Sequence, residues 1–166
     1  MKFSLLDRIS SYEPDAELTA VKNVSLSEEY LADHFPEFPV LPGVFMLEAA
    51  TQAAAWLVRL SEDFQHSIIT LHEAKSLRFV DFVTPGKTLT ITVQQSKREG
   101  NIVGMKFRGT VDDRLCVSGR LSVECANLTD DEPRHEELDR GMIELQRAQC
   151  EILTRRMNAE VEAATA

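Results

Sequence analysis

Apolar and polar residues alternate between residues 68 and 125 in a way that predicts β-strands. In the segment 87–95, Leu89, Ile91 and Val93 alternate with threonines, which is a clean period of two. Pro-Gly, Gly-Asn and Asp-Asp pairs, which favour turns, separate this segment from its neighbours. We therefore expect an antiparallel run of four strands, at residues 68–79, 87–95, 102–110 and 115–125.

A different pattern, over residues 44–60, predicts a long helix. This stretch has no Gly or Pro and is rich in Ala and Leu, which favours a helix of about 25 Å. Its apolar residues do not keep to one stripe and include Val44, Met46, Leu47, Ala50, Ala54, Trp56, Leu57 and Val58. A helix that is apolar on nearly every face is expected to be buried all round. The prediction is an α+β fold with a curved antiparallel sheet wrapped around a long central helix.

The segments before this helix predict one strand and one stiff loop. Residues 17–25 follow the turn-forming sequence Glu13-Pro14-Asp15 and are expected to form the first strand. Ser25 or Ser27 is a candidate cap for a brief helical turn through residues 28–30. Residues 34–43 carry prolines at three-residue intervals, which remove backbone donors and disfavour helix, so an extended loop is expected.

The character of the chain changes after residue 126. Residues 127–166 hold ten acidic and five basic side chains, and from residue 134 they favour helix. One set of residues falls on 4-3 spacing: Leu138, Met142, Leu145, Gln149, Ile152 and Arg156. Gln149, Arg156 and Gly141 weaken that seam as a coiled coil, which favours an amphipathic helix lying on the body or on a partner subunit. We expect a domain at residues 1–126 and an acidic, mostly helical extension at 127–166.

Composition and charge exclude several classes of protein. With 18 basic and 27 acidic residues the formal charge is −9, which disfavours sequence-independent nucleic-acid binding. The cysteines, Cys116, Cys125 and Cys150, have neither metal-ligand spacing nor an even number, so we expect reduced thiols and no metal site. The first residues meet charge too soon for a signal peptide, and the most apolar stretch contains Pro, Gly and Glu. A cytoplasmic protein that does not bind a membrane is expected.

Glu48 is the candidate acid. It is the only ionisable residue between Glu37 and Arg59, in the middle of the apolar helix. Without a cationic neighbour on the helix, its pKa should be raised by desolvation, as a general acid near neutral pH requires. A Glu at an exposed position of the helix, or one paired with a distant Arg, explains the same pattern.

His34 and Gly43 flank the proline-rich loop. His34 precedes it and by itself is compatible with a simple surface imidazole. Gly43 lies at the start of the helix, where backbone N–H groups lack intrahelical acceptors and can bind a developing oxyanion. It is equally compatible with an ordinary Pro-Gly turn.

Taken together, these residues form a specific motif. His34-Phe35-Pro36, further prolines ending in Pro42-Gly43, and Glu48 five residues later resemble the β-hydroxyacyl-(acyl-carrier-protein) dehydratases of bacterial fatty-acid synthesis. The resemblance covers about residues 1–126. It is supported by three other short sequences, Leu6-Asp7-Arg8-Ile9, Arg78-Phe79 and Val83-Thr84-Pro85-Gly86. It implies the hot-dog fold, in which a long helix is wrapped by a curved antiparallel sheet.

The resemblance also implies a reaction. His34 would remove a proton from C2 of a (3R)-3-hydroxyacyl thioester, and Glu48 would protonate the departing hydroxyl. The Gly43 N–H would polarise the thioester carbonyl, and the product would be a trans-2-enoyl thioester. Glu rather than Asp at the acid position resembles the plain dehydratases more than the branch that also isomerises the double bond.

The family further implies partners and secondary contacts. The substrate would be carried on the phosphopantetheine arm of acyl carrier protein, with no cofactor and no metal. The site would be shared across a homodimer, which can assemble further into a trimer of dimers. Candidates for the substrate tunnel are Phe35, Val44, Phe45 and Gln52. Candidates for docking the carrier are Lys75, Arg78, Lys87, Lys97 and Arg98.

Three departures from the family keep other functions open, and one of them is the acidic extension at residues 127–166, which has no counterpart in the minimal family domain. Glu37 stands where the family usually has Gly, and Val80-Asp81 stands where it often has basic residues. A non-catalytic acyl-binding subunit, or one serving a specialised pathway, is therefore an alternative. A hot-dog thioesterase is another, although it does not account for His34 and the spaced prolines. Chain-length preference does not follow from the sequence.

Overall fold

The computed structural model describes residues 3–165, with side chains up to residue 159. Within this range the strands are β1 (Arg8–Glu13), β2 (Glu17–Asn23), β3 (Ile68–Phe79), β4 (Thr88–Glu99), β5 (Ile102–Val111) and β6 (Arg114–Ala126). The helices are α1 (Tyr30–Asp33), α2 (Gly43–Ser61) and α3 (Glu136–Thr165), with short 3-10 helices η1 (Leu128–Asp130) and η2 (Pro133–His135).

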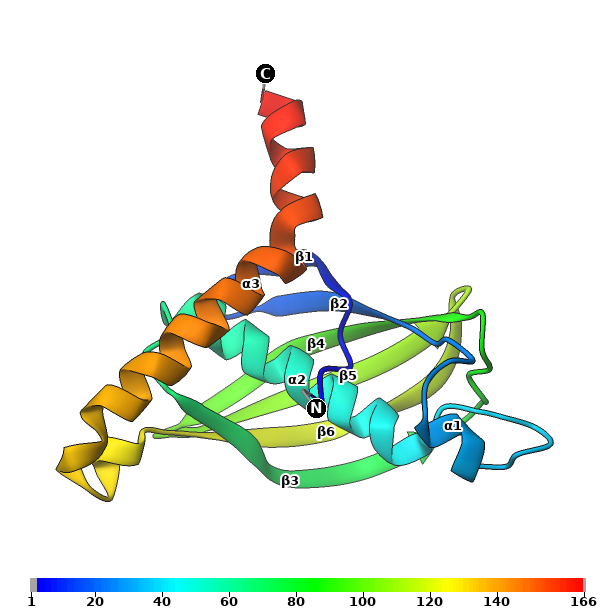
Figure 1. Ribbon diagram of the computed structural model, residues 1–166, viewed down its shortest axis with the longest axis horizontal. Coiled ribbons are helices and arrows are strands. Elements are labelled where there is room, and N and C mark those ends of the chain that lie inside the picture. Colours follow the sequence, from blue (N-terminus) through cyan, green and yellow to red (C-terminus); the bar gives the residue numbers. More distant parts are fainter. Residues whose placement is uncertain (1–2, 166) are drawn as a thin grey trace.

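The strands form one antiparallel sheet that curves around α2 (Figure 1). Its order is β1-β2-β4-β5-β6-β3, so the first two strands and the third lie at opposite edges. In β4, Leu89, Ile91 and Val93 are fully buried, because the period of two directs them all toward the helix. The predicted hot-dog architecture, with four strands after the central helix, is confirmed.

Two N-terminal details differ from the prediction. Strand β1 was not expected, because in its sequence only Ile9 is both apolar and fully buried, too weak a pattern to recognise. The helical turn expected through residues 28–30 begins later, since α1 starts at Tyr30 and has no side-chain cap. Ser25 instead closes a turn, in which its carbonyl oxygen accepts the Glu28 N–H at 3.2 Å.

Alanines bring the sheet close to α2. Ala49, Ala50, Ala53 and Ala54 are all fully buried on the face of the helix that meets the sheet. Because alanine side chains are short, the strands can approach the helix axis closely, and Leu57 fills the space beside them. The apolar composition of the segment thus builds the core, as expected.

The opposite face of α2 is not covered, which corrects the expectation of all-round burial. Val44 is 66% exposed, and Leu47, Glu48 and Gln52 are only partly buried. A single curved sheet can close over one side of a helix, and α3 reaches only part of the other side. Figure 1 shows this uncovered face of α2 toward the viewer.

The two edges of the sheet differ in what covers them. Helix α3 packs against β1, at one edge. Strand β3, at the other edge, has 12 residues, most of them exposed, including Leu71 and Phe79. A long edge strand with exposed apolar side chains is a common site of association with another chain.

Helix α3 confirms the prediction of a C-terminal helix and shows which face contacts the body. Cys150 and Leu153 are buried, whereas Leu138, Leu145 and Ile152 are 56%, 63% and 65% exposed. The residues on 4-3 spacing therefore lie beside the contact face rather than on it. Figure 1 shows the last part of α3 extending away from the body. In the described residues, no helix is long and apolar enough to cross a membrane.

Asp139 anchors the start of α3. Its carboxylate accepts hydrogen bonds from the Ser67 hydroxyl and from the Leu128 and Thr129 N–H groups, the latter two at 2.9 and 3.0 Å. Burial alone would raise the pKa of Asp139, but these hydrogen bonds together lower it to about 2. The carboxylate therefore joins the turn before β3, the end of the sheet and α3.

We expect Asp139→Ala to release the first turns of α3. The folded-state pKa lies below the ordinary value of 3.8, so the carboxylate stabilises the fold above that pH. This contribution should be lost as the pH falls through 3.8 toward 2. Amide hydrogen exchange of residues 136–150 measures the effect, with Glu137→Ala, on an exposed side chain, as the matched control. Equal protection in the two variants would contradict the anchoring role.

Candidate active site

The loop before α2 fixes the orientation and the tautomer of His34. Contrary to the expectation from its prolines, the loop is not extended throughout, because it turns at residues 36–37, where the Phe38 N–H donates to the Phe35 carbonyl oxygen at 2.8 Å. The Nδ1 atom of the His34 ring lies 3.0 Å from the carbonyl oxygen of Val40. Because a carbonyl can only accept a hydrogen bond, Nδ1 must carry the hydrogen. In the neutral ring, Nε2 then keeps its lone pair. His34 is therefore arranged as a base.

Gly43 lies in the same small pocket as His34. The pocket has a volume of about 140 Å³, and its wall includes His34, Gly43, Met46, Phe79 and Asp81. A Cβ atom on residue 43 would lie 3.0 Å from two carbons of the Phe79 ring, so the ring packs directly on the glycine. The structure thus brings together two of the three predicted catalytic residues.

The start of α2 offers donors to this pocket. The Pro42 carbonyl oxygen accepts the N–H groups of Phe45 and Met46, at 2.9 and 3.2 Å. The N–H groups of Gly43 and Val44, the two residues immediately before, have no intrahelical acceptor, and the positive end of the helix dipole lies behind them. An oxyanion held near Gly43 would be stabilised by both effects.

Glu48 opens into a different pocket. Five residues turn an α-helix by about 500°, so Gly43 and Glu48 point about 140° apart. Glu48 lies on the uncovered face of α2, in a pocket of about 350 Å³ whose wall does not include His34. Within one chain, the predicted acid and the predicted base therefore do not share a pocket.

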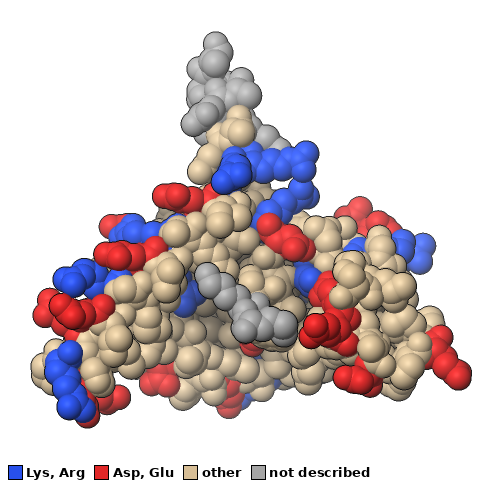
Figure 2. Space-filling view, in the orientation of Figure 1, with Lys and Arg blue, Asp and Glu red and all other residues tan. Residues whose placement is uncertain are grey.

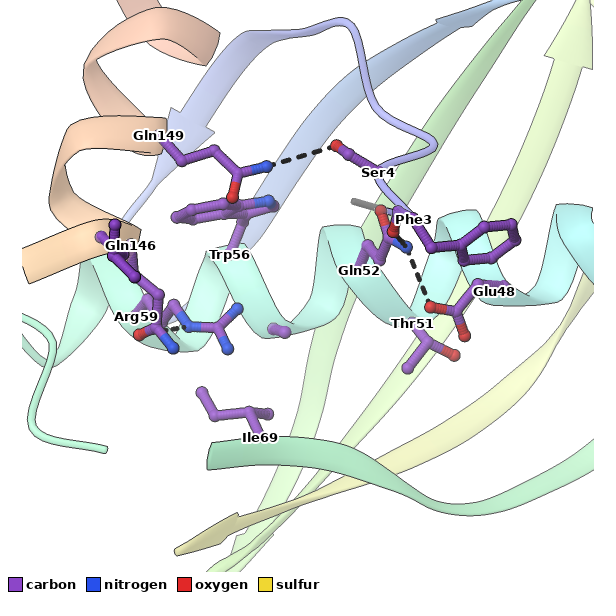
Figure 3. Close-up of a pocket in the computed structure, with 12 residues that line it drawn as sticks. Phe3, Ser4, Glu48, Thr51, Gln52, Trp56, Arg59, Ile69, Gln146 and Gln149 are labelled. Carbon is purple, nitrogen blue, oxygen red and sulfur yellow. Dashed lines mark hydrogen bonds between the residues drawn. The ribbon is translucent and has the colours of Figure 1, made fainter. Parts of the chain in front are cut away.

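Gln52 holds the Glu48 carboxylate in place. Its Nε2 donates to Glu48 Oε1 at 2.9 Å and to the carbonyl oxygen of Phe3 at 3.1 Å, and its Oε1 accepts the Leu5 N–H at 3.0 Å. The backbone of residues 3–5 thereby fixes the orientation of the amide. Figure 3 shows the bond from Gln52 to Glu48 beside the ring of Phe3.

The other tunnel candidates lie outside this larger pocket. Phe45 packs edge-on against Phe3 and Tyr30, with ring centroids 5.2 and 4.7 Å apart. Phe35 and Val44 are exposed, at 59% and 66%. In the single chain, Gln52 is thus the tunnel candidate that lines the Glu48 pocket.

The docking candidates are spread along the sheet. Register places Arg78 and Lys87 at the end of the sheet nearest His34, and Lys97 and Arg98 at the opposite end, with Lys75 between. Four of the five pair with carboxylates: Lys75 with Glu73, Lys87 with Asp112, Lys97 with Glu99 and Arg98 with Glu62.

Arg78 is different, since it makes no ion pair with a side chain that the structure describes. On the face drawn in Figure 2, basic and acidic residues are interspersed. That face carries no continuous basic surface.

The three cysteines are free, as predicted, and all three are buried. Burial raises the pKa of the Cys116, Cys125 and Cys150 thiols, which makes them poor nucleophiles. In the part of the chain that the structure describes, no group of His, Cys, Asp and Glu side chains has the arrangement of a metal site.

Sequence reasoning missed the far wall of the Glu48 pocket. Trp56 and Arg59 of α2 lie there, together with Leu145, Gln146 and Gln149 of α3 (Figure 3). The spacing of 11 residues between Glu48 and Arg59, close to three full turns, was the available signal on α2. The sequence held no corresponding signal that this part of α3 would reach α2.

A sheet-wrapped helix with His34 before its first turn and Glu48 in its second is the arrangement implied by the resemblance to acyl-thioester dehydratases of the hot-dog fold. The model of the FabA-like domain matches residues 1–120, and the chain belongs to this family of β-hydroxyacyl-(acyl-carrier-protein) dehydratases. Helix α3 lies beyond the matched residues.

Curated relatives agree with this assignment. The 3-hydroxyacyl-(acyl-carrier-protein) dehydratase FabZ of Levilactobacillus brevis is 34% identical over 117 residues, 70% of this chain and 79% of the relative. FabZ of Lactococcus lactis subsp. cremoris is 35% identical over 120 residues, 72% of this chain and 83% of the relative.

Two solved structures show the same fold at lower identity. The dehydratase heterocomplex ApeI:P from Xenorhabdus doucetiae is 20% identical, with a TM-score of 0.65 over 76% of this chain and 85% of that one. A mutant thioesterase from Pseudomonas aeruginosa is 18% identical, with a TM-score of 0.57 over 72% of this chain and 80% of that one.

We expect Gly43→Ala to lower the hydration rate of 2-enoyl thioesters by roughly 10- to 100-fold, because the added methyl group pushes the Phe79 ring into the His34 pocket. Gly141→Ala is the control, since nothing lies within 4 Å of its added methyl group. On helix α3 it should raise the free energy of unfolding by about 0.5–1 kcal/mol and leave the rate unchanged. Equal rates for the two variants would argue against a tight pocket at Gly43.

Proposed function

We propose that the protein dehydrates (3R)-3-hydroxyacyl thioesters carried on acyl carrier protein, giving trans-2-enoyl thioesters for fatty-acid biosynthesis. The observation that carries the proposal is the fixed His34 tautomer beside the donor end of α2, in a member of the dehydratase family. We place the catalytic unit in residues 1–126, up to the end of β6, and treat residues 127–166 as an extension.

The proposed reaction uses three groups of this chain. His34 Nε2 takes a proton from C2, and the charge that develops on the thioester oxygen is stabilised by the Gly43 N–H. The C3–O bond then breaks, and a protonated Glu48 gives its proton to the departing hydroxyl, which leaves as water. Gln52 donates to Glu48 Oε1, so the acidic proton belongs on Oε2. The step is an acid–base elimination and needs no cofactor.

We further propose that the site is shared between two copies of the chain. His34 and Glu48 open into separate pockets of one chain, yet the reaction needs both at one substrate. We propose two adjoining surfaces for the contact. One is the uncovered face of α2, which carries Glu48, and the other is the exposed edge of β3. In a homodimer joined there, His34 of one subunit would face Glu48 of the other.

For the carrier we propose docking near Arg78. It lies next to Phe79, which lines the His34 pocket, and its charge is not neutralised by a described carboxylate. Lys87 lies at the same end of the sheet. An acidic carrier bound there would deliver its phosphopantetheine arm to Gly43.

Hydrolysis of the thioester is the competing function, since a thioesterase shares the fold. Hydrolysis requires a water molecule at the carbonyl carbon. It assigns no role to His34, whose ring is oriented by the carbonyl oxygen of Val40. Release of free thiol from a 3-hydroxyacyl thioester, without loss of water, would favour it.

We expect His34→Ala and Glu48→Gln each to lower turnover by roughly 10²- to 10⁴-fold, the contribution of one general acid or base. Hydration of 2-enoyl thioesters, followed spectrophotometrically, measures it, with circular dichroism to verify the fold. Activity within twofold of the unmodified protein in either variant would remove that residue from the mechanism, and unchanged behaviour of both would favour an acyl-binding subunit.

Mixing these two inactive variants tests the shared site. When they are co-expressed in equal amounts and dimers form at random, about a quarter of the sites combine an intact His34 with an intact Glu48. Roughly a quarter of the normal activity should return. If activity stays at the level of the separate variants while mixed dimers are present, each site lies within one chain.

A further inference from the structure

The Glu48 pocket contains a cation for which the dehydration has no use. Arg59, in the last turn of α2, lines the pocket together with Gln146 of α3. Among the side chains that the structure describes, none forms an ion pair with Arg59; Gln146 Oε1 accepts its Nε hydrogen at 3.1 Å. Burial lowers the pKa of Arg59 to about 10, so the guanidinium stays charged at neutral pH.

The orientation of Arg59 is fixed by its neighbours. The Gln146 amide is itself held, because its Nε2 donates to the Ser67 carbonyl oxygen at 2.7 Å. The guanidinium lies 5.2 Å from the centre of the Trp56 ring. Figure 3 shows it directed along α2, toward the end of the pocket where Glu48 lies. Its two terminal nitrogens therefore remain as donors to whatever fills the pocket.

Acid and cation lie at opposite ends of one pocket. Glu48 and Arg59 are 11 residues apart on α2, so they project from nearly the same face, and their Cα atoms are separated by about 16 Å along the axis. Thr51, Gln52 and Ala55 line the space between them. An acyl chain whose C3 is at Glu48 and which extends along α2 would end at Arg59.

We propose that the far end of the acyl chain carries a carboxylate, which Arg59 binds through its two terminal nitrogens. This inference rests on the proposed function and narrows its substrate class to 3-hydroxyacyl thioesters with an anionic end. A planar guanidinium matches a carboxylate in a bidentate pair. A methyl group at this end of the chain would displace water from the Arg59 guanidinium without offering it a hydrogen-bond acceptor, which costs free energy. Gln146, which fixes the orientation of Arg59, belongs to α3 and so lies outside the residues that the family model matches.

The test compares two series of 2-enoyl pantetheine thioesters of increasing length, one ending in methyl and one in carboxylate. At the length that spans the pocket, kcat/KM for hydration should favour the carboxylate by roughly 10- to 100-fold, the factor typical of a hydrogen bond to a charged group. Arg59→Met should remove this preference, and Arg59→Lys should retain part of it. Arg140→Met, an exposed residue of α3, is the control and should leave the preference unchanged.

A second measurement needs no variant. Trp56 is the only tryptophan and lines the pocket, so its fluorescence reports on binding there. A saturated α,ω-dicarboxylate should change the emission at lower concentrations than the monocarboxylate of equal length. Equal binding of the two, or faster turnover of methyl-ended thioesters, would overturn the inference while leaving the dehydratase intact. If neither series is hydrated, the proposed function itself fails.

Discussion

A helix inside one curved sheet can be covered by that sheet on one side only, and the other features of this protein depend on that constraint. The buried alanines of α2 use the covered side to bring the strands close. The other side keeps Glu48 and Gln52 within reach of a ligand. Residues 3–5 and α3 border this open side without closing it. This exposed face, beside an unpaired β3 edge, is the surface at which we propose that a second copy binds.

The same constraint divides the chemistry. The loop before α2 sets the His34 tautomer and directs the imidazole ring to the start of α2, where the Phe79 ring packs directly on Gly43. Glu48 is five residues further along and points to the other side of the helix. If His34 is the base and Glu48 the acid, as proposed, two copies of α2 must meet before both residues can reach one substrate. The proposed reaction therefore requires the proposed dimer.

Much of this could be predicted from the chain alone, because the relevant patterns are local. Alternation in residues 87–95 predicted β4, and the run from Val44 to Leu60 predicted α2. The pairing of His34 with Gly43 was implied by the resemblance of the motif to the dehydratase family. Composition could not show that one face of α2 is left uncovered in the single chain. An apolar face that is exposed has the same sequence pattern as an apolar face that is buried. Strand β1 had too few apolar residues to recognise, and the contact between Gln146 and Arg59 joins segments 87 residues apart.

A crystal structure of the protein with a bound 3-hydroxyacyl pantetheine thioester tests the shared site most directly. We expect two copies related by a two-fold axis, with the open faces of α2 in contact. His34 Nε2 of one copy should lie near C2 of the ligand, and Glu48 of the other copy near its C3 hydroxyl. A ligand bound by His34 and Glu48 of the same chain, or a Glu48 facing bulk water in the assembled protein, would contradict the shared site.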